Sequence, residues 1–267
     1  MRASSAGGRL PLPSSKPYFA SPRPRVLAHR GLAASQPENT LAAFRAAVDL
    51  GAVHLETDVH ATRDGIAVVS HDPSLERLAG LPGLVSDLTM AELESIDLGD
   101  GHTFSSLVSV LDAFPAARFN IDIKSMDAAA PTVAAVKAAA AEHRVLLTSF
   151  DERRRKAVVR ALPGVATSAS GRIFFFALIL AKLGLTPVLA LVLRGVDAVQ
   201  VPERAIGLTI STRRVISRLQ RAGVEVHFWT VNADADIRRL LDRGADGIVT
   251  DRCDRALRIV SERTAKL

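Results

Sequence analysis

Short apolar runs alternate with longer amphipathic stretches along most of this chain, which is the pattern of repeated strand–helix units. The apolar runs predict strands over residues 25–29, 53–59, 66–70, 118–124, 145–150, 198–201, 224–231 and 247–250. The amphipathic stretches predict helices over residues 41–50, 89–96, 107–114, 131–142, 152–162, 212–222 and 235–243. Glycines 51, 223 and 244 follow three of these stretches and are typical of helix ends. The alternation favours a parallel α/β fold.

A turn over residues 62–65 interrupts this alternation. Its Asp64-Gly65 pair predicts a hairpin between the second and third strands. The number of strand–helix units is near eight, which favours a closed barrel over an open sheet. The chain has 267 residues, of which 48% are hydrophobic, and this suffices for one such domain. We therefore expect an α/β fold of the TIM-type (β/α)8 barrel kind, a single domain with a hairpin interruption after the second strand.

The beginning of the chain differs in composition from the rest. Residues 1–24 are rich in Ser, Pro, Gly and Arg, contain no acidic residue and lack the apolar run of a secretory signal. We expect a disordered tail over residues 1–24 and the barrel domain over residues 25–267. An organelle transit peptide is the alternative that this composition leaves open.

An apolar segment over residues 173–193 fits a plain barrel least well. Its length approaches that of a membrane span, but Lys182, Gly184 and Pro187 break it near the middle. Strands are predicted on both sides of it, so a span would disrupt the barrel. Two interpretations stay open: a buried helix–loop–helix of the barrel wall, or a loop at the barrel mouth that dips into a membrane or binds an acyl chain.

The charge balance narrows the choice of partners. The net charge is +6 and the pI is about 10.1, which favours phosphates, nucleic acid or an anionic membrane surface. Since no dense Lys/Arg block is interleaved with aromatic residues, we expect no nucleic-acid partner. The single cysteine, Cys253, excludes an intrachain disulfide and fits a reducing compartment. We expect a cytoplasmic protein, with peripheral membrane contact through residues 173–193 as the open alternative.

Polar side chains in the predicted strands indicate where the chemistry lies. Side chains alternate faces along a strand, so Glu56 and Asp58 share one face, and Asp122 and Lys124 share another. Buried carboxylates need a compensating charge, and oxygen ligands suit Mg²⁺ or Ca²⁺. The C-terminal strand ends of a barrel carry its active site. The polar residues at or just beyond such ends are His29, Glu56, Asp58, His71, Asp122 and Lys124.

Nine short strings give a more specific signal when they are taken in order. They are Ala28-His29-Arg30-Gly31, Pro37-Glu38-Asn39-Thr40, Leu55-Glu56-Thr57-Asp58-Val59, Thr62-Arg63-Asp64-Gly65, Val68-Val69-Ser70-His71-Asp72, Asn120-Ile121-Asp122-Ile123-Lys124, Ser149-Phe150-Asp151, Trp229-Thr230-Val231-Asn232 and Asp246-Gly247-Ile248-Val249-Thr250-Asp251. Together they resemble the glycerophosphodiester phosphodiesterase family, a group of phosphodiesterase barrels similar to phosphatidylinositol-specific phospholipase C. The resemblance extends over about residues 25–260.

This resemblance implies a metal-dependent barrel that hydrolyses glycerophosphodiesters to glycerol 3-phosphate and an alcohol. It also implies a role for each matching residue. His29 and His71 match the catalytic acid/base pair; Arg30 and Lys124 match phosphate contacts; Trp229 matches a pocket wall; Glu56, Asp58 and Asp122 match metal ligands; Glu38 and Asn39 are expected to support them. The position of Asp122 is often Glu in the family, and the shorter side chain puts the choice or placement of the metal in question.

Other interpretations remain beside these. Glu56 and Asp58 could form an ion-pair network with Arg30 and Lys124, and Trp229 could belong to the core. In the same chemistry, a lysophospholipase D acting on lysolipids at a membrane surface is the alternative that the apolar segment favours. A non-catalytic phosphate- or membrane-binding barrel is the alternative of another class. The intact set of histidines, cations and carboxylates argues against it.

Overall fold

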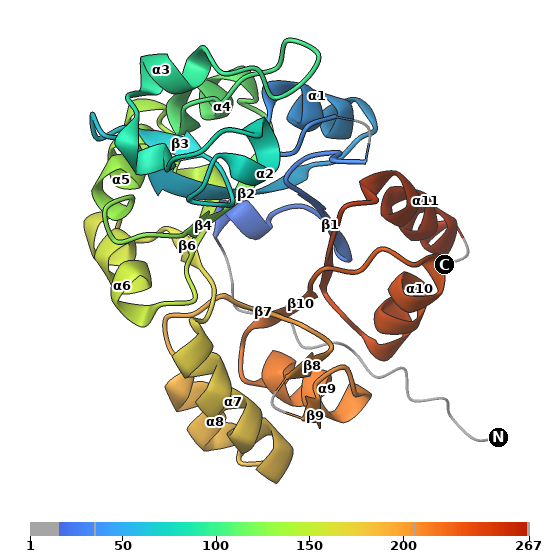
Figure 1. Cartoon of the computed structure of the whole chain (residues 1–267). Coiled ribbons are helices and arrows are strands. Elements are labelled where there is room, and N and C mark those ends of the chain that lie inside the picture. The colour runs from blue at the N-terminus through green and yellow to red at the C-terminus, as the bar shows by residue number, and fades with distance from the viewer. Residues whose placement is uncertain (1–15, 35, 206, 266–267) are drawn as a thin grey trace, which may run out of the picture.

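A closed parallel sheet forms the centre of the molecule (Figure 1). The computed structural model describes residues 16–34, 36–205 and 207–265. Eight parallel strands follow the order β6-β5-β4-β2-β1-β11-β10-β7, and the end strands β6 and β7 meet through a bridge from Ser168 to Ala198. The strands are β1 (Arg25–His29), β2 (His54–Ala61), β4 (Arg118–Ile123), β5 (Val145–Thr148), β6 (Ala166–Thr167), β7 (Ala198–Val201), β10 (Glu225–Phe228) and β11 (Gly247–Thr250). The predicted TIM-type barrel is confirmed.

Helices surround the barrel and bury its outer face (Figure 1). They are α1 (Leu41–Asp49), α4 (Leu107–Ala113), α5 (Ala129–Ala138), α6 (Glu152–Ala161), α7 (Gly171–Leu183), α8 (Thr186–Val192), α9 (Arg213–Arg221), α10 (Asp234–Arg243) and α11 (Cys253–Thr264), with a short 3-10 turn η3 (Glu142–Arg144) before β5. The predicted helices and strands are present, with ends that shift by a few residues. The sequence patterns missed β6, α11 and the hairpin of β8 (Arg204–Ala205) with β9 (Leu208–Thr209).

The predicted hairpin after the second strand opens into a small insertion. Strand β3 (Ala67–Val69) pairs antiparallel with β2. The chain then forms α2 (Glu76–Ala79), η2 (Val85–Asp87) and α3 (Met90–Glu94) before it returns to the barrel. These elements enclose a separate apolar cluster that includes Leu75, Leu93 and Phe104. The insertion matters for the site because His71 lies just after β3.

The junction between β1 and α1 fixes the first site residues. Arg30 and Gly31 both have positive φ, 55° and 85°, so the chain turns sharply after the strand. A Cβ on Gly31 would lie 2.5 Å from the backbone carbon of Ala43 in α1, so only glycine allows this approach. Thr40 then caps α1 by accepting a hydrogen bond from the Ala43 amide at 3.2 Å.

Residues 16–24 are ordered against the barrel, in contrast to the disordered tail predicted over residues 1–24. Residues 1–15 of the predicted tail lie outside the described residues, whereas η1 (Pro17–Phe19) packs against the barrel. Tyr18 and Phe19 are buried in a cluster with Leu146 and Ala198, inside the N-terminal end of the sheet. The disordered tail is therefore wrong for residues 16–24, because two aromatic side chains close that end of the barrel.

The apolar segment 173–193 forms α7, a short loop and α8. One face is buried, with Ala177, Leu178 and Leu189 at 0–1% exposure, and the opposite face is exposed. The helix–loop–helix is therefore part of the barrel wall, but it is only half buried. Within the described residues, the helices are too short or too polar to cross a membrane.

Candidate active site

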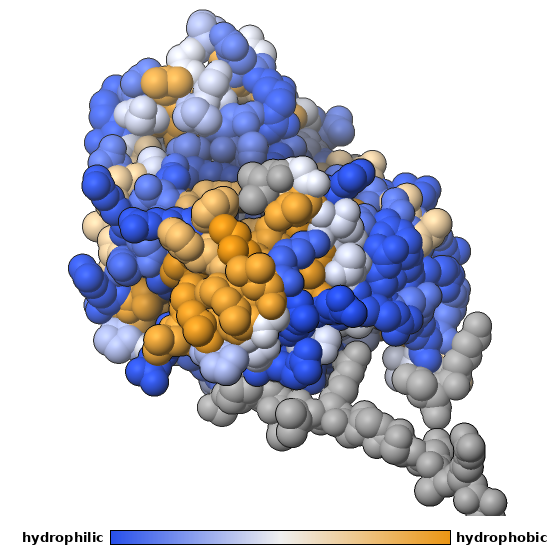
Figure 2. Space-filling view, turned by 90° about the horizontal axis from the view of Figure 1, so that it is seen from below, coloured by the Kyte–Doolittle hydropathy of each residue, from blue (hydrophilic) through white to orange (hydrophobic). Residues whose placement is uncertain are grey.

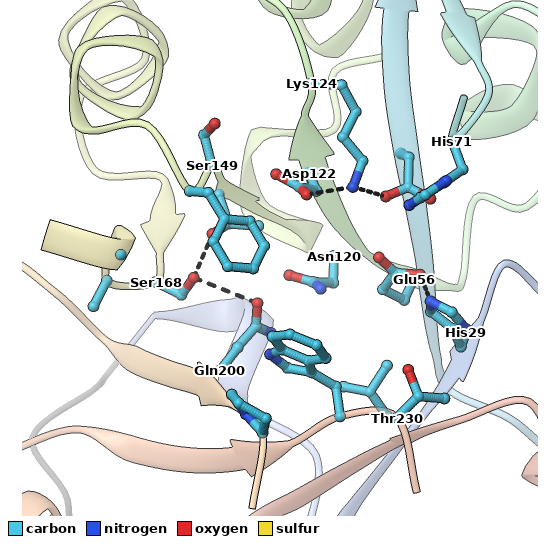
Figure 3. A pocket seen from close by; sticks show the side chains of 18 of the residues that line it. His29, Glu56, His71, Asn120, Asp122, Lys124, Ser149, Ser168, Gln200 and Thr230 are labelled. Atoms are coloured by element: carbon cyan, nitrogen blue, oxygen red, sulfur yellow. Dashed lines mark hydrogen bonds and ion pairs between the residues drawn. The ribbon is translucent and has the colours of Figure 1, made fainter. Parts of the chain in front are cut away.

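Most of the side chains predicted from the sequence line one pocket of about 460 Å³ at the C-terminal strand ends (Figure 3). The predicted residues that line it are His29, Arg30, Glu56, Asp58, His71, Asp122, Lys124 and Trp229. In Figure 3, His29, Glu56 and His71 lie on one side of the pocket, and Ser168 and Gln200 lie across from them. Glu38 and Asn39 are not among the lining residues.

His29 is held at the end of β1 by a carboxylate. Its Nδ1 lies 2.6 Å from Oδ1 of Asp251, and Asn232 donates to the other oxygen of Asp251 at 2.7 Å. A carboxylate only accepts, so Nδ1 carries the hydrogen and Nε2 is left for the pocket. Burial lowers the pKa of His29, but the Glu56 carboxylate and the bond to Asp251 outweigh it and raise the pKa above its ordinary value.

His71 has the same arrangement with a different partner. Its Nδ1 lies 2.6 Å from Oδ1 of Asp72, the next residue. Arg77 donates to the other oxygen of Asp72 and fixes that carboxylate in turn. His60 contacts the backbone carbonyl of His71 at 3.1 Å. Two imidazoles therefore reach one pocket, each oriented through Nδ1 by its own carboxylate.

Asp58 and Asp122 lie against cations. Lys124 contacts Oδ1 of Asp58 and Oδ2 of Asp122, each at 2.8 Å, and Figure 3 shows Lys124 beside Asp122. Arg30 Nε lies 3.2 Å from Oδ2 of Asp58, close enough for an ion pair but not aligned for a hydrogen bond. For Asp58, this is the ion-pair network that the sequence left open.

Glu56 is a buried carboxylate with weak compensation. It is 7% exposed, its Oε2 accepts from the Arg30 amide at 3.3 Å, and the same oxygen lies 3.9 Å from Nε2 of His29. Burial and the nearby Asp58 carboxylate raise the pKa of Glu56 to about 8. Burial also raises the pKa of Asp122. Such shifts mark a cluster of carboxylates that a cation would stabilise.

The donor set suits a hard divalent cation. Three buried oxygens have no hydrogen-bond partner: Oδ2 of Asp58, Oδ1 of Asp122 and Oδ1 of Asn120. Orphaned oxygens in a buried site are costly, and Mg²⁺ or Ca²⁺ takes such ligands. Among the described residues, however, no three His, Cys, Asp or Glu side chains stand close enough together to form a metal site in this arrangement. The residues fit a metal by their chemistry, while Lys124 lies between two of them.

Glu38 and Asn39 both lie beside the site, but they contact different groups. Glu38 accepts from Nη1 of Arg30 at 2.9 Å and from both terminal nitrogens of Arg77, at 2.7 and 2.9 Å. Its carboxylate therefore holds the guanidinium of Arg30 in place. Asn39 has a φ of 59° and accepts from Oγ1 of Thr57 at 2.8 Å, so it holds the turn behind the pocket.

Aromatic side chains form the opposite wall. Trp229 contacts Phe150 edge to face, with ring centroids 5.9 Å apart, and both line the pocket with Phe174. Polar side chains also line the pocket here. The hydroxyl of Ser168 lies 2.5 Å from that of Thr148 and donates to Oε1 of Gln200 at 3.4 Å.

Sequence reasoning assigned no role to several residues of this site: Asp72, Arg77, Asn120, Thr148, Phe150, Ser168, Phe174, Gln200 and Asp251. Asp72 and Asp251 lie inside the strings that carry the family resemblance, so a signal existed for them. Arg77 lies outside every string, and nothing in the sequence pattern distinguishes it. Phe174 also lies outside the strings, but it belongs to the apolar segment 173–193, which one interpretation placed at the barrel mouth.

Known proteins resemble this chain over most of its length. The sequence model of the Glycerophosphoryl diester phosphodiesterase family matches residues 29–255. "Probable glycerophosphodiester phosphodiesterase 2" of Mycobacterium tuberculosis is 39% identical over 231 residues, 86% of this chain and 88% of that protein. The glycerophosphodiester phosphodiesterase of Caldanaerobacter subterraneus is 30% identical over 240 residues, 85% of this chain and 93% of that protein. A crystal structure of glycerophosphodiester phosphodiesterase from Thermotoga maritima is 29% identical, with a TM-score of 0.69 and coverage of 88% of this chain and 96% of that one. This chain therefore belongs to the glycerophosphoryl diester phosphodiesterase family.

Proposed function

We propose that this enzyme hydrolyses glycerophosphodiesters to glycerol 3-phosphate and an alcohol, and that His29 and His71 exchange the protons. The observation that carries the proposal is the pair of imidazoles in one pocket, each with Nδ1 against a carboxylate. An imidazole held in this way presents one defined nitrogen to the substrate, as an acid/base group must.

The cations of the pocket suit an anionic substrate. A phosphodiester carries one negative charge, and more charge develops on its oxygens during transfer. Arg30 lines the pocket and is oriented by Glu38, and Lys124 projects from the end of β4. The guanidinium suits a bidentate phosphate contact, whereas the ammonium acts as a point charge.

A route in two displacements is consistent with these groups. One histidine accepts the proton of the glycerol 2-hydroxyl while that oxygen attacks phosphorus, and the other donates a proton to the departing alcohol. Water then opens the cyclic phosphate, with the roles of the two histidines exchanged. Direct attack by water needs the same pair, with one imidazole as base and the other as acid.

A divalent cation, Mg²⁺ or Ca²⁺, completes the proposal. Glu56, Asp58 and Asp122 would hold it, since they are buried and two of them have an unpartnered oxygen. When bound, it would stabilise negative charge on the phosphoryl oxygens. Lys124 would then neutralise the remaining charge of the carboxylates that it now contacts.

Release of glycerol 3-phosphate from glycerophosphocholine tests this function. The full chain is assayed after chelation and after addition of Mg²⁺ or Ca²⁺. Metal-dependent release supports the whole proposal, and release that a chelator leaves unchanged overturns its metal part. If no glycerol 3-phosphate is released with either ion, the proposed glycerophosphodiester activity is wrong, and a non-catalytic phosphate-binding barrel is favoured.

A second candidate is lysophospholipase D-type cleavage of lysophospholipids at a membrane surface. The apolar wall of Phe150, Phe174 and Trp229 favours it, because such a wall can contact an acyl chain. The same assay decides between the two: choline release from lysophosphatidylcholine, without turnover of glycerophosphocholine, moves the assignment to this candidate.

A further inference from the structure

The hairpin of α7 and α8 carries an unusual concentration of exposed apolar side chains. Seven of the sixteen large apolar side chains exposed in the described chain lie between Phe175 and Leu191. They are Phe175, Phe176, Ile179, Leu183, Leu185, Val188 and Leu191, and Leu183 and Leu191 are 67% and 63% exposed. Figure 2 shows an apolar cluster on one face of the molecule with polar residues around it. We call the seven residues the α7–α8 face. A contiguous patch of this kind marks an interaction site.

The charged residue within this segment does not interrupt the face. The ammonium of Lys182 donates to the carbonyl of Thr209 in β9 at 2.6 Å, so it is bound to the adjacent hairpin. Arg218 of α9 donates to the carbonyls of Ala181 and Lys182 at 2.7 and 3.0 Å. These contacts tie the C-terminal end of α7 to α9, so the face is presented by a fixed element.

Positive charge is concentrated in the part of the chain that contains this face. Residues 153–224 include thirteen Lys or Arg and only two acidic residues, Asp197 and Glu203, whereas the whole chain has 34 and 28. Arg172 and Arg194 flank the hairpin in sequence, and Arg213 and Arg214 begin the neighbouring α9; all four are exposed and form no ion pair with a described residue. An exposed apolar face that has a cation beyond each end in sequence and two more on the adjacent α9 complements an anionic lipid surface.

The face also adjoins the pocket. Phe174 lines the pocket, and the next two residues, Phe175 and Phe176, belong to the exposed face. Gly171, at the start of α7, and Ala205, in β8, line the pocket as well. A surface bound to the α7–α8 face would therefore lie beside the pocket mouth.

We propose that the α7–α8 face docks this enzyme onto an anionic lipid bilayer. Its apolar side chains enter the interface, while Arg172, Arg194, Arg213 and Arg214 contact the headgroups. This goes beyond the proposed hydrolysis, because docking does not require turnover.

Vesicle co-sedimentation of the full chain tests the docking. The vesicles are phosphatidylcholine alone or an equal mixture of phosphatidylcholine and phosphatidylglycerol. We expect pelleting with the anionic mixture, weakened by added salt, and little with phosphatidylcholine alone. Leu183→Glu combined with Leu191→Glu should reduce the bound fraction roughly tenfold, as should Arg213→Glu combined with Arg214→Glu.

Matched variants elsewhere serve as controls. Leu50→Glu places the same change on an exposed leucine after α1, and Lys137→Glu reverses an exposed charge on α5; both should pellet like the wild type. Hydrolysis of glycerophosphocholine in solution should be unchanged in all variants, because none of these residues lines the pocket. The proposal is overturned if the protein does not pellet with the anionic vesicles. It is also overturned if the control variants lose as much vesicle binding as the variants of the α7–α8 face and of α9. A dimer in solution that Leu183→Glu disperses, without vesicle binding, also overturns it and assigns the face to a second copy of the chain.

Discussion

At the scale of residues, two histidines reach one pocket, and each has Nδ1 2.6 Å from a carboxylate oxygen, His29 from Asp251 and His71 from Asp72. Asp72 follows His71 directly, so that pair lies in one string, whereas Asp251 is 222 positions from His29. The motifs therefore predicted both histidines but assigned no role to either carboxylate. The pairing of Asp251 with His29 becomes visible only when barrel closure brings β11 beside β1. The sequence also left undecided whether Asp58 forms ion pairs with Arg30 and Lys124, because spacing along a strand does not show which cation a carboxylate faces.

Replacing Asp251 tests whether it positions His29. In Asp251→Asn, the amide can turn its nitrogen toward Nδ1 and favour the wrong tautomer of the imidazole. We expect kcat for glycerophosphocholine to fall roughly 100-fold with little change in KM. Asp242→Asn changes a surface carboxylate that pairs with Arg263 and should leave both constants unaltered. A change in KM alone would show that Asp251 acts on binding and not through His29.

At the scale of elements, periodicity predicted most strands and helices of the barrel, but it missed the two-residue β6 and also α11, a helix of 12 residues. The alternation in β2 and β4 correctly placed Glu56, Asp58, Asp122 and Lys124 at one end of the sheet. Strand β6 has two residues and no apolar run of its own, so no pattern predicted it. Its place in the barrel comes from pairing with β5 and from the bridge to β7.

The turn between β1 and α1 gives a prediction for stability. Gly31→Ala should be destabilised for two reasons, a positive φ of 85° and a Cβ that would meet the backbone of Ala43 at 2.5 Å. Gly51→Ala is the matched control: its φ is 92°, but nothing lies within 4 Å of the added Cβ. We expect a loss of about 1–2 kcal/mol in the control from backbone strain. Gly31→Ala should lose about 1–3 kcal/mol more from overpacking. Urea denaturation measures both, and equal losses would contradict the close approach of α1.

At the scale of the whole molecule, the two ends of the barrel have different roles. The C-terminal end holds the pocket, and the N-terminal end is closed by Tyr18 over a buried ion pair. Arg25 donates to both oxygens of Glu225, at 2.8 and 2.9 Å, and Glu225 is 3% exposed. The sequence did not predict this closure, because the composition of residues 16–24 resembles that of a tail. The excess of Lys and Arg over residues 153–224, which include the α7–α8 face, is likewise seen only when this part is compared with the whole chain.

The buried pair at the closed end predicts acid sensitivity. Glu225 is buried, but hydrogen bonds from Arg25 and His227 lower its pKa from 4.5 to about 2. Tyr18 and His54 also lie at this end, as do the ion pairs of Asp197 with Lys16 and of Asp246 with Arg23. A depressed pKa stabilises the fold above pH 4.5, and the contribution is lost as the pH falls toward 2.

Glu225→Gln should therefore lose about 3–5 kcal/mol of unfolding free energy at neutral pH, because Arg25 stays buried without a countercharge. The difference from the wild type should shrink as the pH falls below 4.5. Urea denaturation across this range measures it, with the exposed Glu76→Gln as control. A constant difference at every pH would contradict the ion pair as its cause.

The central claim is that His29 and His71 act as an acid/base pair, and turnover of two substrates by their glutamine variants tests it most directly. The substrates are glycerophosphocholine and the corresponding glycerophospho-nitrophenyl diester, whose leaving group departs without a proton. We predict that His29→Gln and His71→Gln each lose about 10²–10⁴ in kcat on glycerophosphocholine. The variant that lacks the acid should regain most of its rate on the nitrophenyl substrate, while the exposed His143→Gln should match the wild type on both. Wild-type turnover of glycerophosphocholine by either pocket variant would contradict the account.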